Sequence, residues 1–376
     1  MIGNRKLAAA LALFALAVLA PPPARAQGDN SWNWIRADDG KKIEVKVHNK
    51  VEFNEDYSDV SAIPSDGSLA ISDSRGSDAI RLVVTRVASG ALERDYTVNG
   101  ARREFDTRAA AWLKDVLLLA ARQGGLDARE RVRRILARGG SRALIEEIAH
   151  VEGDYVRRIY FDELLKVPNL GDGERRDALR DASQSIRSDY ERAELLQHAA
   201  PVYLAKNALT AIFFEALSRV GSDYERHRVL KIALKQADLS TDALVADARS
   251  AAAMTSDYEK ATFLVEAASR YANGDARLRA AFFDALRTVG SDYEHHRVLS
   301  AVVKSPSLSR EALIAVAQSA AALGSDYEKA TFLVEAASRY QTDEQARGAF
   351  VAAMRTIGSE YERNRVEVRL PRMTTN

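Results

Sequence analysis

Histidine is the residue type in this chain best suited to acid–base or metal chemistry, but its spacing is uninformative. No pair of histidines forms H-E-x-x-H or another metal-binding spacing. His227 and His296 occupy the same place in two copies of a repeated stretch, and the next copy has Asn364 there, so duplication explains them. A metal or pH-sensitive site at His295-His296 is the alternative. The six histidines are His48, His150, His198, His227, His295 and His296.

Other catalytic signatures are also missing from the sequence. It contains no nucleophile elbow, no phosphate-binding glycine-lysine loop and no dinucleotide-binding glycine fingerprint. Carboxylate pairs are common, but they sit in a repeated motif that is typical of helix starts. We therefore predict no catalytic residue, no metal site and no cofactor, and we favour a protein that is not an enzyme.

That motif is Ser-Asp-Tyr-Glu. Serine followed three residues later by glutamate is a capping box, in which each side chain bonds to the other residue's backbone N–H. The acidic residues also suit the positive end of a helix dipole. Each copy is thus predicted to begin a helix. The copies are Ser188–Glu191, Ser222–Glu225, Ser256–Glu259, Ser291–Glu294 and Ser325–Glu328, with variants at Gly153–Val156 and Ser359–Glu362.

The tyrosine of each motif is a candidate binding residue. It lies about 150° from the apolar stripe of its helix at 100° per residue, so it is off the main core face. Either it packs on the apolar residue four positions earlier, which is the reading we favour, or the tyrosines form an exposed ladder for a ligand. The candidates for binding are Tyr224, Tyr258, Tyr293 and Tyr327.

Basic residues follow each tyrosine. The residue two positions later is basic in all seven copies and is predicted to form an exposed ion pair within its helix. Alternate copies carry further basic residues, which could lie in register along one line and bind an acidic peptide or anionic polymer. A simple solvated face is the alternative. The candidates are Arg226, Arg228, His296, Arg297, Arg363 and Arg365.

The tyrosines recur every 34 or 35 residues, and a second period of 69 lies above the first. Ser256–Tyr271 and Ser325–Tyr340 are identical. Within one copy, a helix is expected over Asp257–Tyr271 and another over Asp275–Val289. A fixed period of this length indicates a solenoid. We predict a mainly α protein, a right-handed alpha-solenoid of two-helix repeats over 153–376, after a joining helix and capping repeat over 107–152.

Residues 27–106 have a different pattern. Apolar and polar residues alternate around Ile43–Val47, Leu69–Ile71, Ile80–Val87 and Arg94–Val98, and Asn99-Gly100 is a hairpin-type turn. The sequence therefore predicts a small antiparallel β domain of five to seven strands. Trp32 and Trp34 lie just before it, either anchoring the sheet or forming a binding pair.

The N-terminal segment, 1–26, resembles a cleavable signal peptide. Arg5 and Lys6 precede an apolar run over Leu7–Ala20, and Ala24–Ala26 is a small-x-small cleavage site. We expect a bacterial periplasmic or secreted protein that is not a lipoprotein, because the chain has no cysteine. Cleavage would leave 51 basic and 53 acidic residues, a balance that argues against nucleic-acid binding. No later segment is apolar enough to span a membrane.

Two resemblances follow from these motifs. The 34-residue helix pairs resemble tetratricopeptide and HEAT repeats in length and pairing, without the tetratricopeptide signature residues. The second resemblance is looser and is carried by two stretches in order. These are the strand-rich segment that ends at Asn99-Gly100, and the helices before the repeats that contain Trp112-Leu113, Arg131-Val132 and Gly140. They are similar to secreted regions associated with beta-lactam-sensor-type membrane metallopeptidases. The membrane helices and metal motif of those proteases are missing, so the resemblance implies envelope sensing or scaffolding only.

These observations rank three roles. The first is a periplasmic interaction scaffold that binds a protein or peptide along the helical repeats. The second is a sensory or regulatory module in envelope signalling. The third is an enzyme acting on a carbohydrate or polymer, which would need a pocket with converging carboxylates.

Overall fold

The structure is a computed structural model that describes residues 31–236 and 238–369. The predicted signal peptide, residues 1–26, lies outside this range. The chain divides into two compact units, one through Asp115 and one from Val116. This division falls within helix α1 (Thr107–Leu119), so the first turns of the predicted joining helix belong to the sheet unit.

The first unit contains a six-stranded antiparallel sheet in the order β1-β2-β5-β6-β7-β8. One face is apolar because the register places Val45, Ile71, Leu82 and Tyr96 opposite one another across four strands. Short strands β3 and β4 form a separate pair. The strands are β1 (Ser31–Asp38), β2 (Lys41–His48), β3 (Glu52–Phe53), β4 (Val60–Ala62), β5 (Ser68–Arg75), β6 (Asp78–Arg86), β7 (Leu92–Val98) and β8 (Ala101–Arg102).

The predicted turn at Asn99-Gly100 is confirmed. Both residues have positive φ, 51° and 79°, as a tight hairpin turn between two strands requires. Sequence analysis missed β1, whose Trp34 pairs with Val45. Trp32 and Trp34 are half-buried within this edge strand, which fits the anchoring role. Helix α1 packs on the sheet: Trp112 Nε1 donates to Asp73 Oδ2 at 3.0 Å, and its ring lies 6.0 Å from that of Tyr96.

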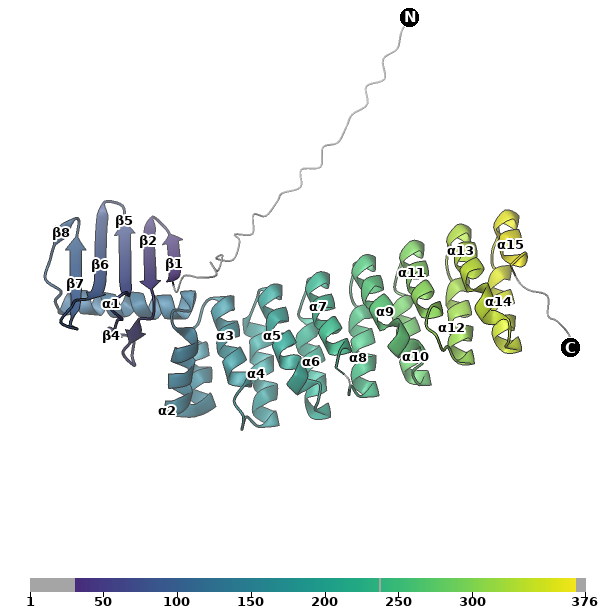
Figure 1. The fold of residues 1–376 in the computed structure, drawn as a ribbon, viewed down its shortest axis with the longest axis horizontal. Coiled ribbons are helices and arrows are strands. Elements are labelled where there is room, and N and C mark those ends of the chain that lie inside the picture. The colour runs from purple at the N-terminus through teal and green to yellow at the C-terminus, as the bar shows by residue number, and fades with distance from the viewer. Residues whose placement is uncertain (1–30, 237, 370–376) are drawn as a thin grey trace, which may run out of the picture. The chain divides into compact units, whose positions relative to one another are not determined.

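The second unit is the predicted helical repeat. After the last residues of α1 it contains a π-helical turn, η1 (Ala120–Gly124), and α2 (Ala128–Ile148), which breaks at Gly140 where φ is +63°. The helices after it alternate between two layers (Figure 1). Layer A contains α3 (Asp154–Leu165), α5 (Asp189–Tyr203), α7 (Asp223–Leu234), α9 (Asp257–Ala272), α11 (Asp292–Val303), α13 (Asp326–Ala336) and α15 (Glu360–Glu367). Layer B contains α4 (Asp172–Ser185), α6 (Asn207–Ser218), α8 (Thr241–Ala252), α10 (Ala276–Leu286), α12 (Arg310–Ala321) and α14 (Glu344–Arg355).

The hydrophobic core lies between the two layers. Each helix contacts the next helix of its own layer, for example α9 with α11 and α8 with α10. Phe263, Phe282 and Phe332 are fully buried there. A second tyrosine, near the C-terminal end of α5 and of α9, is also fully buried, and Tyr203 and Tyr271 donate their hydroxyls to layer B carbonyls. The mainly α architecture with a small N-terminal antiparallel sheet is therefore confirmed.

Candidate functional site

The serine of each motif caps a layer A helix, as predicted. Its Oγ accepts from the backbone N–H of the glutamate three residues later, at 3.3–3.4 Å, in all six copies that contain it. The reciprocal half of the capping box does not form as expected. The serine N–H instead donates to a carboxylate of the preceding repeat.

That carboxylate is the aspartate of the preceding motif. Asp189 Oδ2 accepts from the N–H of Ser222 at 2.8 Å, and Asp223 Oδ2 from that of Ser256 at 2.7 Å. The same bond recurs along the array at 2.7–2.8 Å. Backbone N–H groups of the next repeat also hold the pKa of Asp326 below its usual value. The aspartate thus joins successive repeats, a role beyond the predicted dipole effect.

The predicted intrahelical ion pair forms in three copies, for example between Arg192 and Asp189 at 2.7 Å. Its predicted exposure is wrong, because the basic residue two positions after the tyrosine is mostly buried. Lys260 is 4% exposed and donates to the Thr288 carbonyl at 2.6 Å. Arg226 is 8% exposed and donates to the Val220 carbonyl at 2.7 Å. Arg363 donates to the Ile357 carbonyl at 3.0 Å. These cations satisfy carbonyls at the ends of layer B helices, where the helix dipole favours positive charge.

The motif tyrosines are exposed, so the favoured prediction that they pack on an apolar neighbour is wrong. Their relative exposure lies between 46% and 73%. Each ring projects from the first turn of a layer A helix, because the preceding serine fixes where that helix begins. We call this set the tyrosine row: Tyr155, Tyr190, Tyr224, Tyr258, Tyr293, Tyr327 and Tyr361.

Three of the predicted basic residues lie against this row. The guanidinium carbon of Arg228 lies 5.8 Å from the Tyr190 ring centroid, that of Arg297 5.2 Å from Tyr258, and that of Arg365 5.7 Å from Tyr327. Each arginine reaches back to the tyrosine of the preceding layer A helix. These separations are short enough for cation–π contacts. Every second tyrosine of the row therefore has a planar guanidinium group beside its ring.

The same arginines form ion pairs and are therefore not a line of free cations. Arg228 pairs with Glu225 at 2.7 Å and with Glu194 at 2.8 Å. Arg297 pairs with Glu294 at 3.0 Å, and Arg365 pairs with Glu362. The predicted basic line is thus largely balanced by glutamates.

His295 and His296 point to different neighbours and do not form a joint site. His295 Nε2 lies 2.8 Å from Ser319 Oγ of α12, and burial lowers the pKa of His295 to about 4, so its ring is neutral near pH 7. His296 Nδ1 lies 2.6 Å from Glu328 Oε2 of α13. Within the described residues, no group of three or more histidine or acidic side chains is arranged to hold a metal ion.

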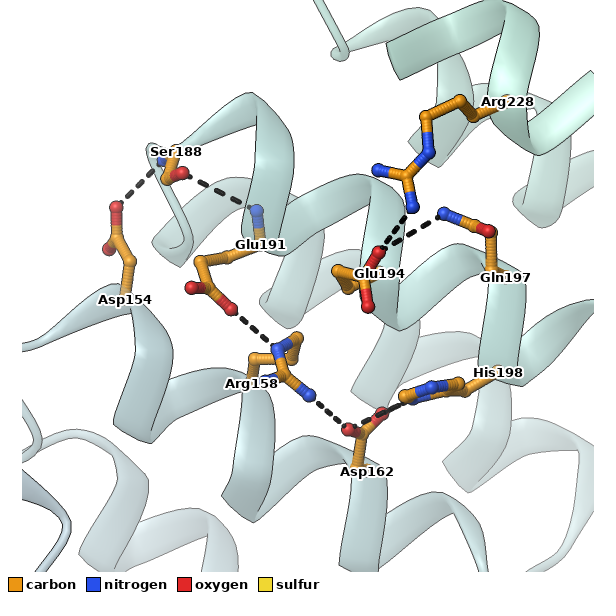
Figure 2. Close-up of polar contacts among 9 residues, drawn as sticks. All are labelled: Asp154, Arg158, Asp162, Ser188, Glu191, Glu194, Gln197, His198 and Arg228. Atoms are coloured by element: carbon orange, nitrogen blue, oxygen red, sulfur yellow. Dashed lines mark hydrogen bonds and ion pairs between the residues drawn. The ribbon is translucent and has the colours of Figure 1, made fainter. Parts of the chain in front are cut away.

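A charged cluster joins α3, α5 and α7 (Figure 2). Arg158 Nη1 donates to Asp162 at 2.9 Å and also pairs with Glu191 of the next repeat. His198 Nδ1 lies 3.1 Å from both oxygens of Asp162. Buried Asp162 therefore orients an exposed imidazole, which is one element of general-base catalysis.

The residues drawn in Figure 2 do not include a free nucleophile for that base. Ser188 is the only hydroxyl residue among the nine drawn in Figure 2, and its Oγ caps α5 by accepting from the Glu191 N–H. Arg158 already balances the charge of Asp162. The arrangement therefore fits a contact between repeats better than a catalytic centre.

Comparisons with known proteins do not add a relative. No family model matches the chain, and searches of curated proteins and of solved structures returned no match. Within residues 31–236 and 238–369, no helix has both the length and the apolar character that a membrane span needs.

Sequence reasoning missed the inter-repeat role of the aspartates and one buried carboxyl group. Asp247 of α8 is fully buried, and only one of its oxygens has a hydrogen-bond partner, the Tyr271 hydroxyl at 3.0 Å. The sequence does contain a sign of this carboxyl group. The residue 69 positions later, at the same place in the next copy, is the apolar Val316, which marks the position of Asp247 as a core position.

Proposed function

We propose that this protein is a periplasmic or secreted interaction scaffold without enzymatic activity, which binds a protein or peptide through the tyrosine row. The observation that supports it most directly is the exposure of seven equivalent tyrosines on consecutive layer A helices. Tyrosine supplies a large, rigid, amphipathic contact at low entropic cost. Exposed aromatic residues in a regular array favour recognition over a purely structural role.

The spacing of the row suits an extended peptide. Packed helices lie about 8–10 Å apart, so successive tyrosines are separated by roughly that distance. A polyproline II segment rises about 3.1 Å per residue and repeats every three residues, which gives about 9.3 Å per turn. One face of such a segment could therefore meet one tyrosine in each repeat, and apolar or proline residues at every third position would suit the rings.

The charges near the row support a ligand with little net charge. The arginines that lie against the rings are already paired with glutamates. A strongly acidic ligand would have to displace these ion pairs. Contact with the rings and with tyrosine hydroxyls requires no such displacement, so binding should persist at high salt.

The test is capture from an envelope extract with residues 27–376 as bait, at low and high salt. A variant with Tyr224, Tyr258 and Tyr293 changed to serine should lose at least tenfold in affinity for the captured partner. Its melting temperature should stay near that of the wild type, because substitutions of exposed residues change stability by about 0.5 kcal/mol or less.

The matched control changes exposed layer B residues, Glu215→Ser with Asp284→Ser, and should bind like the wild type. Equal capture by the tyrosine variant would exclude the row as the binding surface. Capture of no protein at either salt would argue against the scaffold itself and direct the search to glycans and small ligands.

A sensory or regulatory module in envelope signalling is the second candidate. It is supported by the resemblance of the strand-rich segment and following helices to secreted regions associated with beta-lactam-sensor-type metallopeptidases. Its distinguishing result would be capture of a membrane-embedded signalling protein by the same bait.

A further inference from the structure

Two junctions between layer A helices contain the same histidine contact. His227 of α7 places Nδ1 2.7 Å from Glu259 Oε2 and Nε2 4.0 Å from Glu266 Oε2, both on α9. His296 of α11 places Nδ1 2.6 Å from Glu328 Oε2 and Nε2 3.6 Å from Glu335 Oε2, both on α13. We call each histidine with its two glutamates a histidine clip.

The rings of the clips are held in place by packing. His227 packs edge-on against Phe263 at 6.5 Å, and His296 against Phe332 at 5.9 Å. The glutamates and the phenylalanine occur at the first, fifth and eighth positions after the motif tyrosine, which is one face of a helix. Both histidine side chains are 15% exposed or less. Each clip therefore presents two carboxylates to one confined imidazole.

A neutral imidazole cannot satisfy both carboxylates. One nitrogen of the neutral ring donates and the other accepts, so Nδ1–H can serve Glu259 while Nε2 has nothing to accept from Glu266. His227 Nε2 is indeed buried without a hydrogen-bond partner. A protonated ring has a donor on both nitrogens and carries a charge that attracts both glutamates.

Each clip also contains a lysine from the histidine's own helix. Lys231 of α7 pairs with Glu266, and Lys304 of α11 pairs with Glu335 at 3.3 Å. Although burial opposes it, hydrogen bonds from Ser300 and Lys304 keep the pKa of Glu335 below its usual value. Within the described residues, the two glutamates of each clip are the acidic side chains within 4.0 Å of its ring nitrogens.

We propose that the two histidine clips are proton-dependent joints that tighten the α7–α9 and α11–α13 junctions as the pH falls from about 7.5 to 5.5. Protonation adds the second donor and the positive charge, so the folded junction gains contacts that the opened junction lacks. The folded junction is therefore favoured when the imidazole is protonated.

The array supplies its own matched controls. The equivalent position in α3 is Arg158, which pairs with Glu191 of α5 and keeps its charge at every pH in this range. The equivalent position in α15 is Asn364, which cannot be charged. Junction α3–α5 is not itself independent of pH, because His198 of α5 contacts Asp162 of α3. The matched control is therefore His227→Asn with His296→Asn, which replaces each clip by a residue that the array already contains there.

The experiment is amide hydrogen exchange of the whole chain at pH 7.5 and 5.5, expressed as protection factors so that the intrinsic pH dependence of exchange cancels. Asp247 beside α9 and buried His295 of α11 also respond to pH, and they do so equally in the wild type and the variant. The comparison is therefore between the two proteins: on acidification, protection of α7, α9, α11 and α13 should rise roughly three- to tenfold more in the wild type than in the double asparagine variant.

An equal change in protection in the two proteins would overturn the proposal. A second measurement covers the case in which the variant folds poorly. In the wild type with labelled histidine rings, NMR should show His227 and His296 taking up a proton between pH 7.5 and 5.5. Rings that remain neutral at pH 5.5 would also overturn it. Neither outcome depends on whether the tyrosine row binds a partner.

Discussion

Helices α9 and α13 begin with the same stretch of sequence, yet they differ in structure. Ser256–Tyr271 and Ser325–Tyr340 are identical in sequence. Helix α9 is α-helical through Ala272, whereas α13 ends at Ala336 and continues as a 3₁₀ helix, η2, over Ala337–Tyr340. Identical local sequence thus gives different last turns, and the cause must lie outside these sixteen residues, in the segments that follow them or in the helices packed against them.

One difference beside these helices concerns the buried tyrosine of each copy. Tyr271 donates to the Leu244 carbonyl and contacts Asp247 Oδ2, both at 3.0 Å. Tyr340 donates to the Leu313 carbonyl at 2.9 Å, and Val316 stands where the first copy has aspartate. Burial raises the pKa of Asp247 well above its usual value, so its carboxyl group favours the protonated form. The comparison teaches that two copies with the same buried tyrosine differ by one titratable group beside it.

The largest expected change in the free energy of unfolding comes from replacing Val316 by aspartate, the residue that the first copy has at this position. Val316→Asp should destabilise the protein by about 3–5 kcal/mol at pH 7.5, because a buried acid there would lack enough partners. Urea unfolding followed by circular dichroism measures the change. Val316→Ala is the control for lost packing, at about 1–3 kcal/mol. A loss for aspartate no greater than that for alanine would contradict the argument.

The period and capping chemistry made much of the repeat unit predictable. Helices expected over Asp257–Tyr271 and Asp275–Val289 are found over Asp257–Ala272 and Ala276–Leu286. Serine capping is a local interaction within four residues, and the hairpin turn at Asn99-Gly100 is local as well. Strand β1 was missed because it is an edge strand, paired on one side only.

The candidate site was less predictable because its interactions join residues about one repeat apart. The partner of Asp223 is Ser256, and the partner of Lys260 is the Thr288 carbonyl. Neither partner can be recognised from helix spacing alone. Burial of a lysine also runs against the usual preference of charged residues for solvent. Once these residues take the inner positions, the tyrosine beside them is left facing outward.

The reverse substitution, Asp247→Val, should stabilise the protein by about 1–3 kcal/mol near neutral pH, because it removes a buried oxygen without a partner. The folded-state pKa of Asp247 is raised, so the wild type is most stable below the unfolded value near 4 and loses stability as the pH rises toward the folded value. The advantage of the variant should therefore grow between pH 4.5 and 7.5. Urea midpoints at both pH values measure it, and a constant advantage would mean that Asp247 does not hold a proton in the fold.

The smallest expected effect sharpens the comparison through the tyrosine hydroxyls. Tyr340→Phe removes one hydrogen bond to a carbonyl and should cost about 1 kcal/mol. Tyr271→Phe also removes the single partner of Asp247, so it should cost about 2 kcal/mol. In the Asp247→Val background the two costs should become equal, because the two copies then have the same apolar residue beside the ring. If a difference of about 1 kcal/mol persists there, it must arise from the different last turns of α9 and α13 and not from the carboxyl group.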